Sequence, residues 1–208
     1  YCFTNYIFMD YSRCIKPCTV CTKLSYLVMY LISVPFLVGT EYILKIWLGE
    51  VPMYAVLFTQ LLIIERLIDS LNNGIAEIVF ADGNISFYQI STNTIRLLSI
   101  VAGFVFLYTG YPPYSLLYCY IIATVLIVLF KHVSLARISN IDTKCIYRDS
   151  YIPSVAVTLL TLPVFFYRVF EYPLLDICIK ELYVVVVIFM IGLRGDERRK
   201  ILVTLKRK

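Results

Sequence analysis

Six polar side chains lie on a stretch of the sequence that is otherwise apolar enough to cross a membrane. They comprise three carboxylates, one arginine and two amides: Glu65, Asp69, Glu77, Arg66, Asn72 and Asn73. At about 100° per residue in an α-helix these positions fall within an arc of roughly 140°, and apolar side chains fill the opposite side. Each ionised group at the centre of a bilayer costs roughly 2.5 to 3.5 kcal/mol on insertion scales. The cluster therefore predicts a site that faces protein or water, where carboxylates exchange protons or cations and the arginine binds an anion.

The next apolar stretch is also polar in its first half, which includes Asn93 and Arg96. The short connection at residues 81–84 predicts that the two stretches are antiparallel neighbours. Asp69 and Arg96 each lie 11 residues from the inner end of their stretch. At about 1.5 Å per residue this distance is roughly 16 Å, so both side chains are expected in the middle of the membrane.

Ion pairing between the two stretches reduces the cost of burying these charges. We expect Arg96 to pair with Asp69 or Glu65, and Arg66 to pair with Asp69 at i+3. Two interpretations remain open. In the first, the charges only neutralise each other and hold packed helices in register. In the second, they line a cavity in which Arg66 and Arg96 bind phosphate, because a planar guanidinium contacts phosphate bidentately, and Glu65, Asp69 and Glu77 bind protons or sodium.

The composition predicts a membrane protein, with 60% hydrophobic residues and a mean hydropathy of +0.80. A hydrocarbon core of about 30 Å needs about 20 mostly apolar residues per helix. Six segments meet this test, approximately at residues 18–38, 54–80, 85–108, 115–133, 151–170 and 174–193. The runs do not alternate as the strands of a membrane β-barrel do. We therefore predict a single all-α transmembrane domain over residues 1–208, a polytopic helix bundle with a cytoplasmic tail at residues 194–208.

The positions of lysine and arginine predict how the bundle is oriented, because positively charged connections stay on the cytoplasmic side. Of the 19 basic residues, 14 lie at or before the start of the first span, at the end of the fourth span and in the connection after it, or in the tail. Both ends of the chain are therefore expected in the cytoplasm. The net charge of +5 reflects this topology, and no soluble domain carries a basic groove for nucleic acid. Lys131, at the inner end of the fourth span, is expected to lie outside the polar site.

The seven cysteines and the single histidine do not indicate a cofactor or a metal site. Cys14, Cys18 and Cys21 have a spacing that suggests an iron–sulfur cluster in a soluble barrel enzyme, but the third already enters a span. Thiols on the cytoplasmic side are normally reduced, so a disulfide is not expected. His132, beside Lys131, is expected at the membrane interface.

Four short motifs follow one another over about residues 40 to 115. Residues 43–52 contain Trp-Leu-Gly followed by Pro, residues 68–70 read Ile-Asp-Ser, residues 81–89 read Ala-x-Gly-x-Ile-x-x-Tyr-Gln, and residues 110–113 read Gly-Tyr-Pro-Pro. In this order they resemble bacterial O-antigen and capsular polysaccharide flippases of the MATE-like MOP superfamily. Asn84 departs from the pattern, since a basic residue often follows the turn glycine in that family.

The resemblance implies a fold of about 12 to 14 helices in two lobes around a cavity that opens to each face in turn. This chain corresponds to the C-terminal portion of such a transporter, located in the bacterial inner membrane. The implied function is translocation of a lipid-linked oligosaccharide, without covalent chemistry and therefore not as an enzyme. The implied partners are undecaprenyl-pyrophosphate-linked oligosaccharide, membrane lipid and other polysaccharide-assembly proteins.

Other functions remain open. A multidrug or cation antiporter of the same superfamily would use the acidic residues, but arginines in its site would be a hindrance. A membrane-embedded glycan polymerase or acyltransferase would need a catalytic base near a membrane surface and usually a sizeable outer connection, whereas no outer connection here exceeds about 15 residues. A structural subunit that transports nothing is a further alternative.

Overall fold

Helices account for the regular structure of the part of the chain described by the computed structural model, which covers residues 11–74, 85–138, 147–166 and 172–192. The bounds are α2 (Tyr11–Leu48), α3 (Ala55–Ser70), α5 (Ile85–Tyr108), α6 (Ser115–Ile138), α8 (Ile152–Phe166) and α9 (Pro173–Val187). A π-helical segment, η1 (Tyr147–Tyr151), leads into α8, and a second, η2 (Ile188–Gly192), continues α9. The expected all-α class is therefore confirmed.

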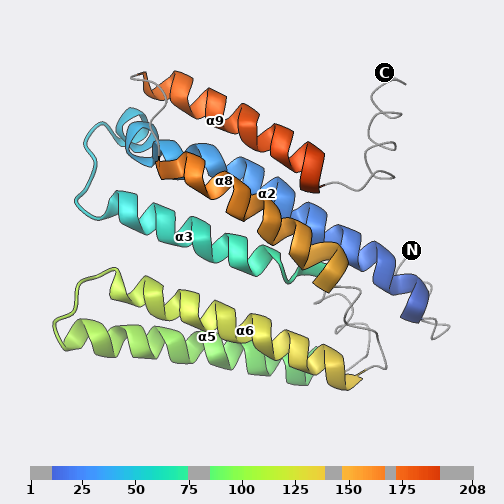
Figure 1. The fold of residues 1–208 in the computed structure, drawn as a ribbon. Helices are drawn as coiled ribbons and strands as arrows, with labels where there is room; N and C mark the ends of the chain where they lie inside the picture. Colours follow the sequence, from blue (N-terminus) through green and yellow to red (C-terminus); the bar gives the residue numbers. More distant parts are fainter. Residues whose placement is uncertain (1–10, 75–84, 139–146, 167–171, 193–208) are drawn as a thin grey trace.

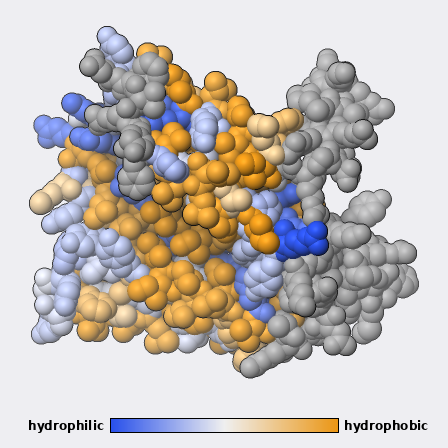
Figure 2. Space-filling view, in the orientation of Figure 1, coloured by the Kyte–Doolittle hydropathy of each residue, from blue (hydrophilic) through white to orange (hydrophobic). Residues whose placement is uncertain are grey.

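Three of these helices contain a segment long and apolar enough to cross a membrane, at Cys18–Leu48, Ile85–Tyr108 and Ser115–Leu135. Figure 2 shows a broad band of hydrophobic side chains across the face in view, with hydrophilic side chains gathered at the left edge and beside the grey atoms on the right. The described residues are thus consistent with a membrane protein. The expected number of six spans is not confirmed, since α3, α8 and α9 are each only 15 or 16 residues long.

Helix α3 occupies the centre of the bundle (Figure 1). One side of α3 packs against α2, which in turn packs against α8 and α9. Another side packs against α6, and α6 forms a close antiparallel hairpin with α5. Because α3 contacts both groups of helices, its side chains decide how the α5–α6 hairpin is held against α2, α8 and α9.

The apolar side of α3 faces the hydrophobic core. This core contains eight buried residues from four helices: Tyr26, Leu27, Tyr30, Val34, Leu67, Val157, Val184 and Val187. Leu67 is the contribution of α3, and Ile63 and Leu71 pack beside it. Leu67, opposite the acidic residues of α3, is therefore buried against protein, and the acidic residues contact α5 and α6.

Aromatic side chains lie at the C-terminal ends of α2 and α5 and just before α3 and α6. Figure 1 shows these helix ends together at the left. Trp47 is 82% exposed and Tyr108 is 95% exposed. Tyr54, which precedes α3, contacts Tyr114, which precedes α6, with 6.1 Å between ring centroids. Exposed amphipathic rings at helix ends are typical of the headgroup region of a bilayer. The positive φ of Gly110 allows the tight turn between α5 and α6.

The expected single helix over residues 54–80 is wrong, because α3 ends at Ser70. The backbone N–H of Asn72 donates to the backbone carbonyl of Asp69 in a tight turn. The Ser70 hydroxyl donates to the Leu67 carbonyl, and the Tyr151 hydroxyl donates to the Leu71 carbonyl. In a continuous helix these carbonyls would accept hydrogen bonds from backbone N–H groups, and here the hydroxyls donate to them instead. Residues 75–80, the connection at 81–84 and the tail at 194–208 lie outside the described residues.

Replacing Tyr151 by phenylalanine is expected to destabilise the protein by about 1 kcal/mol, since it removes the hydrogen bond to Leu71. Thermal unfolding in detergent measures this change. Tyr147→Phe is the matched control, because Tyr147 is 45% exposed. Equal melting temperatures for the two variants would contradict the role assigned to the Tyr151 hydroxyl.

Candidate polar site

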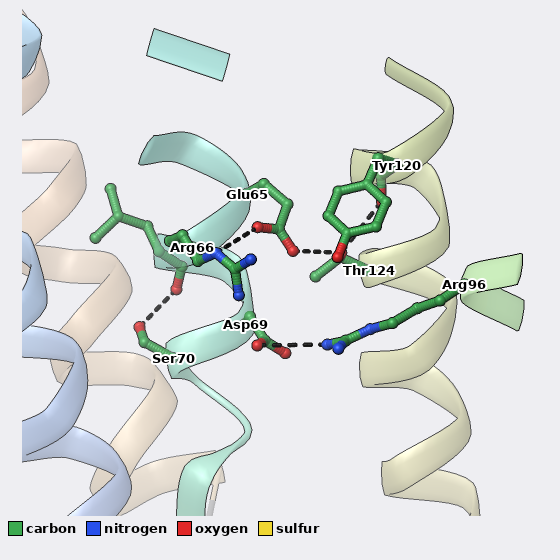
Figure 3. A network of polar contacts seen from close by, with 8 residues as sticks. Glu65, Arg66, Asp69, Ser70, Arg96, Tyr120 and Thr124 are labelled. Atoms are coloured by element: carbon green, nitrogen blue, oxygen red, sulfur yellow. Dashed lines mark hydrogen bonds and ion pairs between the residues drawn. The ribbon is translucent and has the colours of Figure 1, made fainter. Parts of the chain in front are cut away.

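An ion pair joins the two helices that the sequence predicted to face each other. The Nη2 atom of Arg96, on α5, lies 3.6 Å from Oδ2 of Asp69, on α3. Arg96 lies 11 residues after the start of α5 and 12 before its end, so it stands near mid-helix. Figure 3 shows its side chain reaching past α6 toward Asp69. The expected pairing of these two residues is confirmed.

Glu65 forms a second connection between α3 and the α5–α6 hairpin. The residue is 1% exposed, and its Oε1 atom accepts a hydrogen bond of 2.8 Å from the Thr124 hydroxyl on α6. Its Oε2 atom lies 3.2 Å from Nε of Arg66. Figure 3 shows the carboxylate of Glu65 between Arg66 and Thr124.

The expected pairing of Arg66 with Asp69 is therefore replaced by a pair with Glu65. The carboxylate of Glu65 turns into the α3–α6 contact, and the long side chain of Arg66 reaches back to it. The Arg66 side chain is 53% exposed. Its guanidinium consequently has donors available beyond the one that faces Glu65.

Lys131 belongs to this site, although the sequence analysis placed it outside. Its ammonium lies 5.7 Å from the centroid of the buried Tyr88 ring, which stacks on Phe130. It is also close enough to Asp69 and Arg96 to interact electrostatically with both. Lys131 follows Thr124 by seven residues on α6, which is about two helical turns and places both on one face. This seven-residue spacing is the feature of the sequence that could have predicted the place of Lys131 beside the site.

The remaining candidate residues do not converge on one point. Asn73 and Asn93 are exposed, whereas Asn72 is 1% exposed. Neither polar atom of the Asn72 side chain has a hydrogen-bond partner among the described residues. Glu77 lies outside the described residues. The six-residue stripe is interrupted because the helix ends at Ser70, and only Glu65, Arg66 and Asp69 share α3.

A further ion pair, within α9, was not expected from the sequence. Lys180 and Asp176 on α9 lie 2.7 Å apart, and both side chains are at least nine-tenths buried. Both residues lie within the last expected span, residues 174–193. The i,i+4 spacing of an acid and a base within that span was the available signal.

The charges around Asp69 leave an excess of positive charge. Arg66 pairs with Glu65, Arg96 pairs with Asp69, and Lys131 lies over the Tyr88 ring, so these cations outnumber these anions by one. The planar guanidinium of arginine binds anions such as phosphate through two parallel hydrogen bonds. Among the described residues, no group of three or more His, Cys, Asp and Glu side chains could hold a metal ion.

The arrangement of these groups thus defines an anion-binding candidate at the junction of α3, α5 and α6. Anion binding is the expected chemistry because positive charges are in excess at this junction. No protein-family model matches the chain, and neither the curated proteins nor the solved structures include a significant match to it.

Proposed function

We propose that this chain is part of a transporter that moves a lipid-linked oligosaccharide across the bacterial inner membrane. The pyrophosphate of the undecaprenyl carrier binds at Arg96, with Arg66 and Lys131 beside it. The observation that carries the proposal is the Asp69–Arg96 contact near the middle of α5, within an excess of positive charge.

The geometry of the Asp69–Arg96 pair suits exchange with a ligand. Charge-assisted hydrogen bonds between nitrogen and oxygen are typically about 2.7 to 2.9 Å long. The 3.6 Å separation here is longer, and the Arg96 side chain is 36% exposed. An incoming phosphate can therefore bind the guanidinium of Arg96 in place of Asp69. Asp69 remains close enough to pair with Arg96 again after the phosphate is released.

Exposed polar groups next to the pair support a water-filled passage. Arg66 precedes Asp69 by three residues, and Asn93 precedes Arg96 by three residues, so each lies one turn from a member of the pair. Both are exposed. Polar side chains at membrane depth face protein or water rather than acyl chains. The proposal places further helices of a two-lobe transporter around this face, with both ends of the present chain in the cytoplasm.

The alternatives fit the site less well. In a cation antiporter the carboxylates would have to be available, but Glu65 contacts Arg66 and Thr124, and Asp69 contacts Arg96. A polymerase would need a large outer connection. The two described connections at that end, residues 49–54 and 109–114, have six residues each.

The test is to replace Arg96 by alanine in the full-length protein and to measure surface polysaccharide in a complemented deletion strain. A charge-assisted hydrogen bond contributes about 1.5 to 3 kcal/mol, so transport is expected to fall by about tenfold or more. Arg148→Ala is the matched control, since Arg148 is an exposed arginine in η1. Lys131→Ala is expected to give an intermediate loss.

Three outcomes are informative. Loss with Arg96→Ala and none with Arg148→Ala supports the proposal. Equal effects contradict it. Single repeat units on the surface, in place of polymer, would indicate a polymerase instead.

A further inference from the structure

An apolar cavity of about 390 Å³ lies between α2, α3 and α8, away from the polar site. Its lining includes Tyr26 of α2, Leu67 and Ile68 of α3, and Leu162 and Phe165 of α8. The Tyr26 hydroxyl is hydrogen-bonded to Thr158 at 2.6 Å, and the neighbouring Tyr30 hydroxyl to Thr161 at 2.5 Å. The hydroxyls of both tyrosines are thus satisfied by threonines of α8, and most of the lining residues are apolar.

Such a cavity suits hydrocarbon rather than water. A buried water needs two to four polar partners, whereas apolar cavities of about 150 Å³ stay dry and admit benzene. This cavity is more than twice that volume. Two of its lining side chains, Ile64 at 41% and Leu162 at 45%, are exposed at the surface of the bundle. An apolar opening in a protein with membrane-spanning helices meets the acyl chains of the bilayer.

The position of the cavity decides which lipid it takes. Around α3, the lining residue Leu67 lies opposite Glu65 and Asp69, and Ile64 lies at least about 100° from both at 100° per residue. A carrier lipid with its pyrophosphate at Arg96 would therefore have α3 between its headgroup and the cavity. The cavity is not placed to receive the chain of that lipid.

We propose that the cavity between α2, α3 and α8 binds one acyl chain of a bilayer phospholipid. The chain fills the space between the core cluster and the lipid phase and joins α8 to α3. This site is separate from the anion site and does not depend on the transport proposal.

Photolabelling tests the proposal directly. The full-length protein is reconstituted in phosphatidylethanolamine vesicles that contain a phospholipid with a diazirine in one acyl chain, and labelled residues are found by mass spectrometry. Leu67 is 8% exposed and Tyr26 is 7% exposed, so label on them requires a chain inside the cavity. Leu98 on α5 is 61% exposed, and its neighbour Leu97 is 62% exposed. Leu98 is therefore the expected site of ordinary contact with the bilayer.

The matched variants are Ile64→Trp, which fills the opening from an exposed position, and Leu98→Trp on α5. Label on Tyr26 and Leu67 is expected in the wild type and in Leu98→Trp, and is expected to be lost in Ile64→Trp. Label confined to exposed residues of the wild type overturns the proposal, whether or not the variants fold. Label on Tyr26 from a diazirine polyprenyl phosphate but none from the phospholipid also overturns it, and assigns the cavity to the carrier.

Discussion

Replacing Lys180 by methionine is expected to destabilise the protein by about 3 to 5 kcal/mol, the typical cost of removing one partner of a buried ion pair. The ammonium lies 2.7 Å from the Asp176 carboxylate, and the two side chains are 3% and 8% exposed. Without the Lys180 ammonium, the carboxylate loses this charged partner while it stays buried. Denaturant or thermal unfolding in detergent micelles measures the loss.

The double variant Asp176→Leu, Lys180→Met is the control for this prediction. Replacing a buried ion pair by apolar side chains of similar volume is often neutral or stabilising. Most of the lost stability is therefore expected to return. If the double variant is as unstable as Lys180→Met alone, the loss of stability does not come from leaving the carboxylate without its partner.

Replacing Gly74 by alanine is the second large change, with an expected loss of about 3 kcal/mol from overpacking. A methyl group at this position would collide with the backbone carbonyl oxygen of Cys18 and with the Thr22 hydroxyl, both on α2. That hydroxyl is itself held on the Cys18 carbonyl at 3.0 Å. Because backbone atoms cannot turn aside as a flexible side chain can, the two segments must move apart.

Ser86→Thr on α5 is the comparison for Gly74→Ala, since it also adds one methyl group but at an exposed position. Its melting temperature is expected to stay within a degree or two of the wild type, in line with the small effects of most surface substitutions. A wild-type melting temperature for Gly74→Ala would show that the close approach to α2 does not exist.

The pairing of Asp69 with Arg96 was predictable because two simple constraints agree. The helical period puts the acids of α3 on one arc, and Arg96 lies in the polar half of the next apolar stretch. The cost of burying a charge then makes the opposite charge the expected neighbour. No property of the chain beyond local spacing was needed for this result.

The end of α3 at Ser70 was not predictable from local composition. The turn at Leu71 and Asn72 is supported by the hydroxyl of Tyr151, which lies 80 residues further along the chain. A hydropathy profile averages over such a turn and continues the helix through it. The same limit explains why Lys131 was expected outside the polar site, since its place depends on Tyr88 of α5.

The lengths of the helices show a related limit. Composition identifies apolar segments, but the regular α-helical parts of α8 and α9 are shortened by the π-helical segments η1 and η2 at their ends. Such segments arise where packing displaces one residue from the helical ladder, a choice made by the neighbouring helices. The sequence predicted apolar helices correctly and could not predict which of them are long enough to span.

Water accessibility at Asn93 tests most directly whether the charged groups of α3, α5 and α6 adjoin an aqueous site within the membrane. Single cysteines at Asn93 and Leu98 are introduced into the full-length protein after its native cysteines, which include the seven of this chain, are changed to serine. A charged, water-soluble thiol reagent reacts with the thiolate, which forms readily in water and not in apolar surroundings. Rapid labelling at position 93 and none at position 98 is the predicted result, whereas equal and slow labelling at both positions would contradict the account.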